Sequence, residues 1–159
     1  MKNIVAIVLI TFGVLSVSVV VGGADNRIKI NLAASEKDFI LEEMRHYVST
    51  IQQILVVLSE DDMQAVAKIA KSNSLENLSI SEKKMKKVLA KKLPKGFQRL
   101  EKPIHKMFGN LAKIASSGGS AKQIQKTLGN SMQNCVACHA TYSITALNSD
   151  KLKPKSLLW

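Results

Sequence analysis

Apolar residues recur at three- and four-residue intervals over most of the chain, and this period predicts amphipathic helices. The first helix is long and has one apolar stripe. The stripe is formed by Ile40, Met44, Tyr47, Val48, Ile51, Ile54, Leu55 and Leu58. A polar run at 59–62 ends this helix and begins a shorter one, whose apolar positions are Met63, Val66, Ile69 and Ala70.

The pattern is weaker over residues 75–93, where a lysine-rich helix is expected. Its apolar positions are Met85, Val88 and Leu89. Pro94 ends it, and a longer helix opens near Phe97. The apolar positions of that helix are Leu100, Ile104, Met107, Phe108, Leu111 and Ile114. Pro103 lies about two turns into it, so the helix either starts there or is kinked.

Ser120 is expected to cap the last helix. The inward positions of this helix are Ile124, Leu128, Met132, Cys135, His139 and Tyr142. No strand-like alternation is visible, and residues 148–159 form a basic tail without periodicity. Four main amphipathic helices with short polar connections are typical of a bundle. The sequence therefore predicts an all-α fold, an antiparallel four-helix bundle.

The N-terminus has the pattern of a secretory signal peptide. Lys2 precedes an apolar run at 4–21, and small residues then lead to the charged Asp25. We expect residues 1–24 to be the signal peptide and residues 25–159 to form one exported domain. The apolar run has about the length at which a membrane-spanning helix begins, so an uncleaved anchor is the alternative.

The only two cysteines of the chain lie in a C-x-x-C-H run, from Cys135 through Cys138 to His139. This run is the attachment pattern of a c-type haem, in which each thiol bonds a vinyl group and the histidine ligates the iron. A dithiol oxidoreductase would be expected beside a βαβ pattern, which is missing here. A zinc site needs four ligands, and only the distant His46 and His105 remain as nitrogen donors. We therefore expect one covalent haem c.

Export combined with a c-type haem favours the periplasm of a bacterium. The whole chain has a formal net charge of +11, and the domain without its signal peptide has +10. Such a balance favours acidic protein partners or an anionic membrane surface. Nucleic acid is not expected, because the protein is exported and has no basic patch interleaved with aromatic residues. Seven lysines lie between residues 83 and 95, either as a solvated helix face or as a docking patch for such a redox partner.

With C-x-x-C-H on its last helix, the chain resembles the class II c-type cytochromes, which are cytochrome c-prime and its low-spin relatives. Three stretches carry the resemblance over most of the domain: Glu42–Arg45, Leu93–Leu100 and Met132–Tyr142. The resemblance implies a left-handed antiparallel bundle with the haem near the C-terminal helix. Cys135 and Cys138 would hold that haem. The resemblance also implies homodimers that form through the first two helices. The family often has a basic residue where this chain has Ser143.

The sixth ligand of the iron would decide the function. The resemblance places the first helix on the distal side of the haem, where Met44 is the candidate ligand. The alternative is that Met44 does not bind the iron and only fills space in the core. His46 is two residues further on and points about 200° away, toward solvent. We expect His105 to pack at the edge of its stripe. Tyr142, one turn after His139, is expected to pack on the porphyrin, and a hydrogen bond to a haem propionate is the alternative. Met107 and Met132 are expected to be core residues.

Two functions follow from the sixth site. With His139 and Met44 as axial ligands, the protein is a periplasmic monohaem electron carrier and not a bond-making enzyme. With a five-coordinate iron, it binds NO or CO as a gas buffer or sensor. Peroxidase-like activity is a weaker alternative, because it requires a distal acid or base and His46 points outward.

Overall fold

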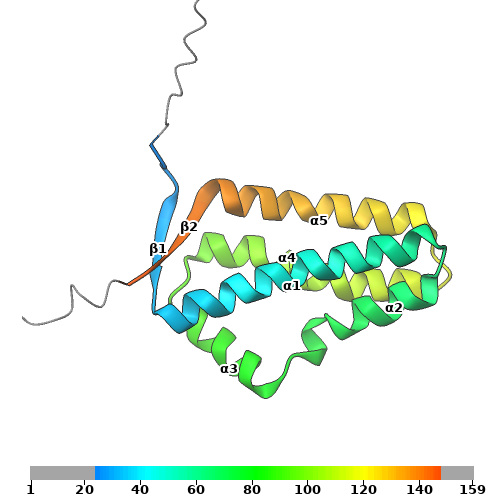
Figure 1. Cartoon of the computed structure of the whole chain (residues 1–159), viewed down its shortest axis with the longest axis horizontal. Helices are drawn as coiled ribbons and strands as arrows, with labels where there is room; N and C mark the ends of the chain where they lie inside the picture. Colours follow the sequence, from blue (N-terminus) through cyan, green and yellow to red (C-terminus); the bar gives the residue numbers. More distant parts are fainter. Residues whose placement is uncertain (1–23, 148–159) are drawn as a thin grey trace, which may run out of the picture.

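A computed structural model describes residues 24–147, and most of these residues are helical, which confirms the predicted all-α class (Figure 1). Residues 1–23, nearly all of the predicted signal peptide, and the basic tail from residue 148 lie outside the described residues. The elements are β1 (Ile28–Leu32), α1 (Ala34–Ser59), α2 (Met63–Ser72), the 3-10 turn η1 (Leu75–Asn77), α3 (Ile80–Leu89), α4 (Lys95–Ser116), α5 (Ala121–Thr141) and β2 (Tyr142–Ala146). No helix within residues 24–147 is long and apolar enough to span a membrane.

The starts of the two last helices agree with the sequence pattern, but α5 ends at Thr141, one residue before Tyr142, which was expected on the helix. Ser120 caps α5 by accepting a hydrogen bond from the Gln123 amide, as predicted. Helix α4 runs without interruption from Lys95 and contains Pro103 in its interior, so the helix does not start at this proline. Gly118 follows α4 with a φ of 73°, a left-handed conformation that glycine adopts without steric cost.

Helix α4 packs against both α2 and α5, and α1 packs against α2 (Figure 1). The buried side chains between these helices form one apolar cluster, which we call the interhelical core. It consists of Tyr47, Ile54, Leu58, Val66, Ala70, Ile104, Met107, Phe108, Leu111, Ala115, Ile124 and Leu128. A second cluster, which we call the strand-end cluster, lies where the strands meet the helices. It consists of Ile30, Leu32, Ile40, Leu89, Leu93, Phe97 and Cys138.

The structure contains two strands that the sequence pattern does not predict. β1 and β2 pair in parallel, with Ile28 opposite Tyr142 and Ile30 opposite Ile144. Ile30 and Leu32 point into the strand-end cluster and are almost completely buried. The strand pair therefore ties the beginning of the domain to the end of the helix that carries the cysteines.

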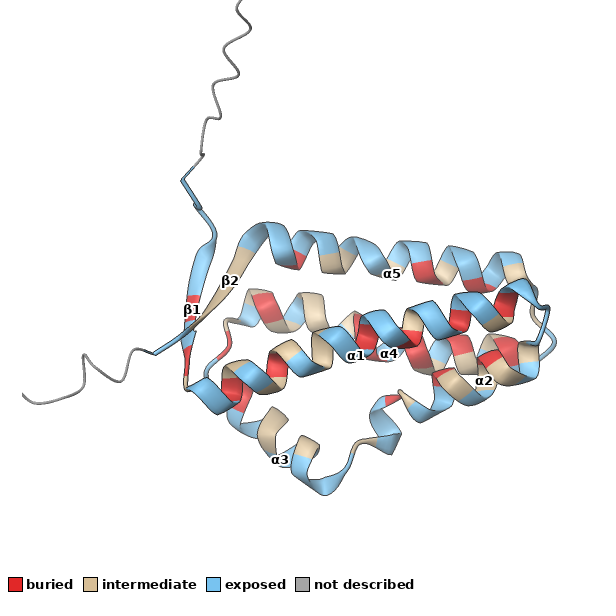
Figure 2. Cartoon of the chain, in the orientation of Figure 1, coloured by how far each residue is buried: buried red, intermediate tan, exposed pale blue. Residues whose placement is uncertain are grey.

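The long helices carry both buried and exposed residues (Figure 2), and five residues expected on buried stripes are exposed. The first is Val88 of α3, which is 40% exposed. On α1, Val48 is 69% and Leu55 46% exposed, because both lie about 80–100° around the helix from the line of Tyr47 and Ile54. On α5, Met132 is 45% exposed at the edge of the stripe. His139 is exposed because the last turns of α5 pack sideways, through its neighbour Cys138, on the strand-end cluster.

Candidate functional site

The C-x-x-C-H run lies entirely within α5, near its C-terminal end, as predicted. Its three- and four-residue spacings place Cys135, Cys138 and His139 along one side of the helix. Cys138 is buried in the strand-end cluster, and Cys135 is half-buried against the interhelical core. Neither cysteine forms a disulfide. The motif is thus presented on a rigid element at the boundary between the two clusters.

Both thiols are in surroundings that favour the neutral form. Burial raises the pKa of Cys135, and burial followed by the charges of Cys135 and Glu101 raises the pKa of Cys138. Dithiol oxidoreductases instead lower a cysteine pKa, often at a helix N-terminus, because the thiolate is the reactive species. These cysteines lie at the opposite end of their helix. The geometry therefore disfavours a dithiol redox site.

A pocket of about 240 Å³, which we call the motif pocket, opens beside Cys138 and His139. Its walls come from the segment before β1, from α1, from the start of α4 and from the junction of α5 with β2. The lining residues are Arg27, Ile40, Leu41, Met44, Phe97, Cys138, His139, Tyr142, Ser143 and Ile144. The structure thus brings four of the five predicted site residues together in one pocket; the fifth, Cys135, does not line it.

Met44 is the methionine of this pocket. It is half-buried, packs against both apolar clusters and lines the wall that α1 contributes. His46 is exposed, which confirms its predicted outward direction. Met107 is buried in the interhelical core, and the exposed Met132 does not line the motif pocket. Among the residues considered for the sixth ligand, only Met44 borders the pocket that contains His139.

Tyr142 lines the same pocket, although it begins β2 and does not lie within the helix. Its ring packs edge-on against Phe97, with centroids 5.6 Å apart and an interplanar angle of 67°. The Tyr142 hydroxyl also approaches the backbone at Gly96 so closely that a side chain there would collide with it. Phe97 and Gly96 therefore hold the tyrosine ring in the pocket wall.

A second cavity of about 230 Å³ shares Ile40, Met44 and Phe97 with the motif pocket. It extends toward α3, where Leu89 and Leu93 line it. Each volume is below the roughly 300–1,000 Å³ of typical small-molecule sites. Met44 borders both spaces, so its side chain has open volume on two sides.

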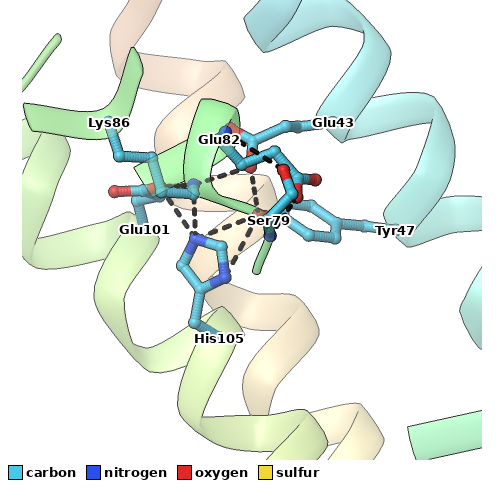
Figure 3. Close-up of polar contacts among 7 residues, drawn as sticks. All are labelled: Glu43, Tyr47, Ser79, Glu82, Lys86, Glu101 and His105. Atoms are coloured by element: carbon cyan, nitrogen blue, oxygen red, sulfur yellow. Dashed lines mark hydrogen bonds and ion pairs between the residues drawn. The ribbon is translucent and has the colours of Figure 1, made fainter. Parts of the chain in front are cut away.

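The far wall of the second cavity is a network of ionisable side chains from α1, α3 and α4 (Figure 3). Lys86 Nζ lies 2.6 Å from Glu43 Oε1, 3.2 Å from Glu101 Oε1 and 3.0 Å from His105 Nε2. His105 Nε2 is 2.9 Å from Glu101 Oε1, and the Tyr47 hydroxyl is 3.0 Å from the same ring nitrogen. His105 therefore packs in the interior through polar contacts.

The network perturbs the acidity of two members. Burial and then the charges of Glu43 and Glu101 raise the pKa of Tyr47 far above its usual value, so it stays neutral. Burial raises the pKa of Glu101, but the hydrogen bond to His105 and the charge of Lys86 outweigh it, and the net pKa is lowered. Two pairs spaced by four residues, Glu43 with Tyr47 and Glu101 with His105, were the signal in the sequence for this network.

The lysines between residues 83 and 95 divide into two groups. Lys86 belongs to the network, and Lys92 pairs with Glu36 at 2.5 Å. The other five are exposed on and after α3: Lys83, Lys84, Lys87, Lys91 and Lys95. Part of the run is therefore structural, and the rest is a basic surface.

The residues around the motif pocket fit a covalent haem. Two thiols and an imidazole lie on one helix, a thioether lines the wall, and most other lining side chains are apolar. A haem iron takes only axial ligands from the protein, so it needs no larger cluster of donors. Within residues 24–147, no group of three or more His, Cys, Asp or Glu side chains could hold a bare metal ion.

Comparisons of this chain with protein-family models, with curated proteins and with solved structures found no match.

Proposed function

We propose that this protein is a monohaem c-type cytochrome that carries single electrons. Cys135 and Cys138 hold one haem c through thioether bonds, and His139 is its proximal iron ligand. The observation that carries the proposal is the motif pocket, where Cys138 and His139 at the end of α5 share one space with Met44 of α1. The haem supplies one-electron redox chemistry, and the protein fixes the ligands and excludes water.

Met44 is the second axial ligand in this proposal. Its thioether is a soft donor that favours ferrous iron, and a saturated iron suits electron transfer because no substrate needs to bind it. The apolar side chains of Ile40, Phe97 and Ile144 in the pocket wall would keep water away from the iron. Nothing in this assignment requires bond-making catalysis by the protein, so we do not propose an enzyme.

We also propose that α1, α2, α4 and α5 form an antiparallel four-helix bundle of the class II cytochrome type. The packing of α4 against α2 and α5, and of α1 against α2, supports this arrangement (Figure 1). The short helix α3 would then be an addition to the side of the bundle, held by the ion pairs of Lys86.

The proposed location is the periplasm, with residues 1–24 as the signal peptide or an uncleaved anchor. The proposed partner is an acidic or membrane-bound redox protein. The five exposed lysines on and after α3 support this partner, because long-range attraction to an acidic surface raises the association rate. Salt should weaken that attraction, since the Debye length shrinks with ionic strength.

Gas binding is the second candidate function. It is favoured by the open volume on two sides of Met44, which would leave space for NO or CO beside the thioether. In that case Met44 lines the distal side of the haem without ligating the iron in the resting state.

Optical spectra of the oxidised, reduced and CO-exposed holoprotein test the electron-carrier proposal, with Met44→Ala as the variant. We expect a low-spin wild-type spectrum that CO leaves unchanged, and a high-spin, CO-reactive spectrum for Met44→Ala. Met132→Ala is the matched control, because Met132 is exposed on α5 outside the motif pocket. A wild-type spectrum that is high-spin and shifts with CO would refute ligation by Met44 and favour gas binding.

A further inference from the structure

One side of the motif pocket carries two polar side chains with unused hydrogen-bonding capacity. These are Arg27, directly before β1, and Ser143, the second residue of β2. Apart from the motif residues and Tyr142, the other lining side chains are apolar. The pocket therefore has a polar region that is distinct from its apolar walls.

The Ser143 hydroxyl has no hydrogen-bond partner. Its Oγ is buried, and it is the one buried side-chain nitrogen or oxygen without a partner among residues 24–147. Folded proteins pair nearly all such atoms, because an unsatisfied buried hydroxyl has lost its hydrogen bonds to water. Because Ser143 also lines the motif pocket, its orphaned hydroxyl is available to a polar group of a ligand bound there.

The Arg27 guanidinium is held in place but not saturated. Its Nε and Nη2 donate to Asp25 at 2.8 Å each, and its Nη1 donates to the His139 carbonyl at 3.3 Å. A guanidinium has five N–H donors, so two are left for a ligand. The contact with the His139 carbonyl places this positive charge directly beside the haem motif.

The parallel strand pair explains why these two residues line the same pocket. Ile28 lies opposite Tyr142, and Lys29 lies opposite Ser143. This register brings Arg27, at the start of the domain, to the residues that follow the motif. The strands thus have two roles: they cover the strand-end cluster, and they place the polar side chains of Arg27 and Ser143 in the wall of the motif pocket.

We propose that Arg27 and Ser143 bind a carboxylate of the haem, with the guanidinium as the ionic partner and the Ser143 hydroxyl as a hydrogen-bond donor. The assignment rests on the proposed function, because the haem supplies the carboxylate. Arginine is suited to this role, since its planar fork matches a carboxylate and the charge-assisted bonds are strong. Asp25 acts as a positioning residue that fixes the other edge of the guanidinium.

The reduction potential of the holoprotein gives the first test. Arg27→Gln removes the positive charge that offsets the haem carboxylate, and the potential should fall because the ferric state gains stability. Ser143→Ala should lower the potential by a smaller amount. The matched controls are Arg45→Gln, an exposed arginine of α1, and Ser117→Ala, an exposed serine after α4. Shifts for Arg27→Gln and Ser143→Ala no larger than those of the controls would overturn the proposal.

A second test separates carboxylate binding from a general effect of charge. The full-length apoprotein is titrated with mesohaem, which cannot form thioether bonds, and with its dimethyl ester, which has no free carboxylates. We expect wild-type protein to bind mesohaem about tenfold more tightly than the ester, as for a hydrogen bond to a charged group. The Arg27→Gln/Ser143→Ala variant should bind both alike, whereas the Arg45→Gln/Ser117→Ala control keeps the preference.

The outcomes distinguish this proposal from the function on which it rests. Equal wild-type affinity for mesohaem and its ester, or a preference that survives in the Arg27→Gln/Ser143→Ala variant, overturns only the carboxylate assignment. Failure to bind either compound, together with purified protein that carries no covalent haem, overturns the proposed function and this inference with it.

Discussion

The interhelical core and the strand-end cluster contain similar apolar side chains but are closed in different ways. Helices alone close the interhelical core, in which Ile54, Val66, Phe108, Leu111 and Ile124 have no exposed surface. The strand-end cluster is closed by two strands, the end of α3 and Cys138, with half-buried Met44 and Tyr142 packed against it. The motif pocket and the second cavity both adjoin this cluster.

This difference separates the part of the molecule that provides stability from the part that contains the candidate site. Regular apolar stripes build the interhelical core, whose side chains are almost all apolar. At the strand end, the stripes give way to the Met44 thioether, the Cys138 thiol and the orphaned hydroxyl of Ser143. Substitutions at the two ends should therefore have different consequences.

Phe108→Ala in the interhelical core should have the largest effect. Phe108 is fully buried between helices, and truncating such a side chain costs about 3–5 kcal/mol through lost burial and the cavity left behind. Urea denaturation should show this loss while the haem spectrum of the folded protein stays unchanged. A loss below about 1 kcal/mol, or a changed haem spectrum, would contradict the separation of the two ends.

Lys86→Met should have the next largest effect. It leaves Glu43 and Glu101 close together without their shared cation, and we expect a loss of about 1–3 kcal/mol in the free energy of unfolding. Lys84→Met is the control, because Lys84 is exposed on the same helix, and its effect should stay within about 0.5 kcal/mol. Equal effects of the two variants would show that the network does not hold α3.

Two glycine substitutions within α4 should have opposite signs. Gly96→Ala places a methyl group against the Tyr142 hydroxyl, and the overpacking should cost about 1–3 kcal/mol and disturb the motif pocket. Gly109→Ala meets open space and should stabilise the helix by about 0.5–1 kcal/mol. Thermal unfolding of both variants checks the prediction, which is wrong if Gly96→Ala is as stable as Gly109→Ala.

Acid should weaken the protein partly through the ionic network. The pKa of Glu101 is lower in the folded protein than its ordinary value. Glu101 therefore contributes fully to the free energy of unfolding at pH values above its ordinary pKa, and this contribution is lost as the pH falls through its lower pKa in the folded protein. Urea midpoints should decrease from about pH 7 to about pH 3. Glu101→Gln should show a smaller decrease, and an identical decrease in both proteins would exclude this role of Glu101.

The helical part of the fold could be predicted because its signals are local. Ile124 and Leu128 were placed correctly by a four-residue spacing, and Ser120 by its capping chemistry. Val48 and Leu55 were placed wrongly, because a wide apolar stripe does not reveal which of its edges a neighbouring helix covers. The strands were missed because the pairing of Ile28 with Tyr142 joins segments far apart in the chain.

The candidate site could be predicted only where its residues are close in sequence. Cys135, Cys138 and His139 form a contiguous motif, and the first helix suggested Met44 through the family resemblance. Arg27 could not be found, because its place beside the motif depends on the strand register. The ionic network likewise combines three helices, and each helix contributes only one or two of its members.

The most direct test of the account is the mass of the purified protein after denaturation. Expressed in cells that attach c-type haems, the chain should retain one haem in denaturing solvent, and the Cys135→Ser/Cys138→Ser variant should lose it. A wild-type mass equal to that of the polypeptide alone, from cells that load other c-type cytochromes, would contradict the central claim that this motif holds a haem.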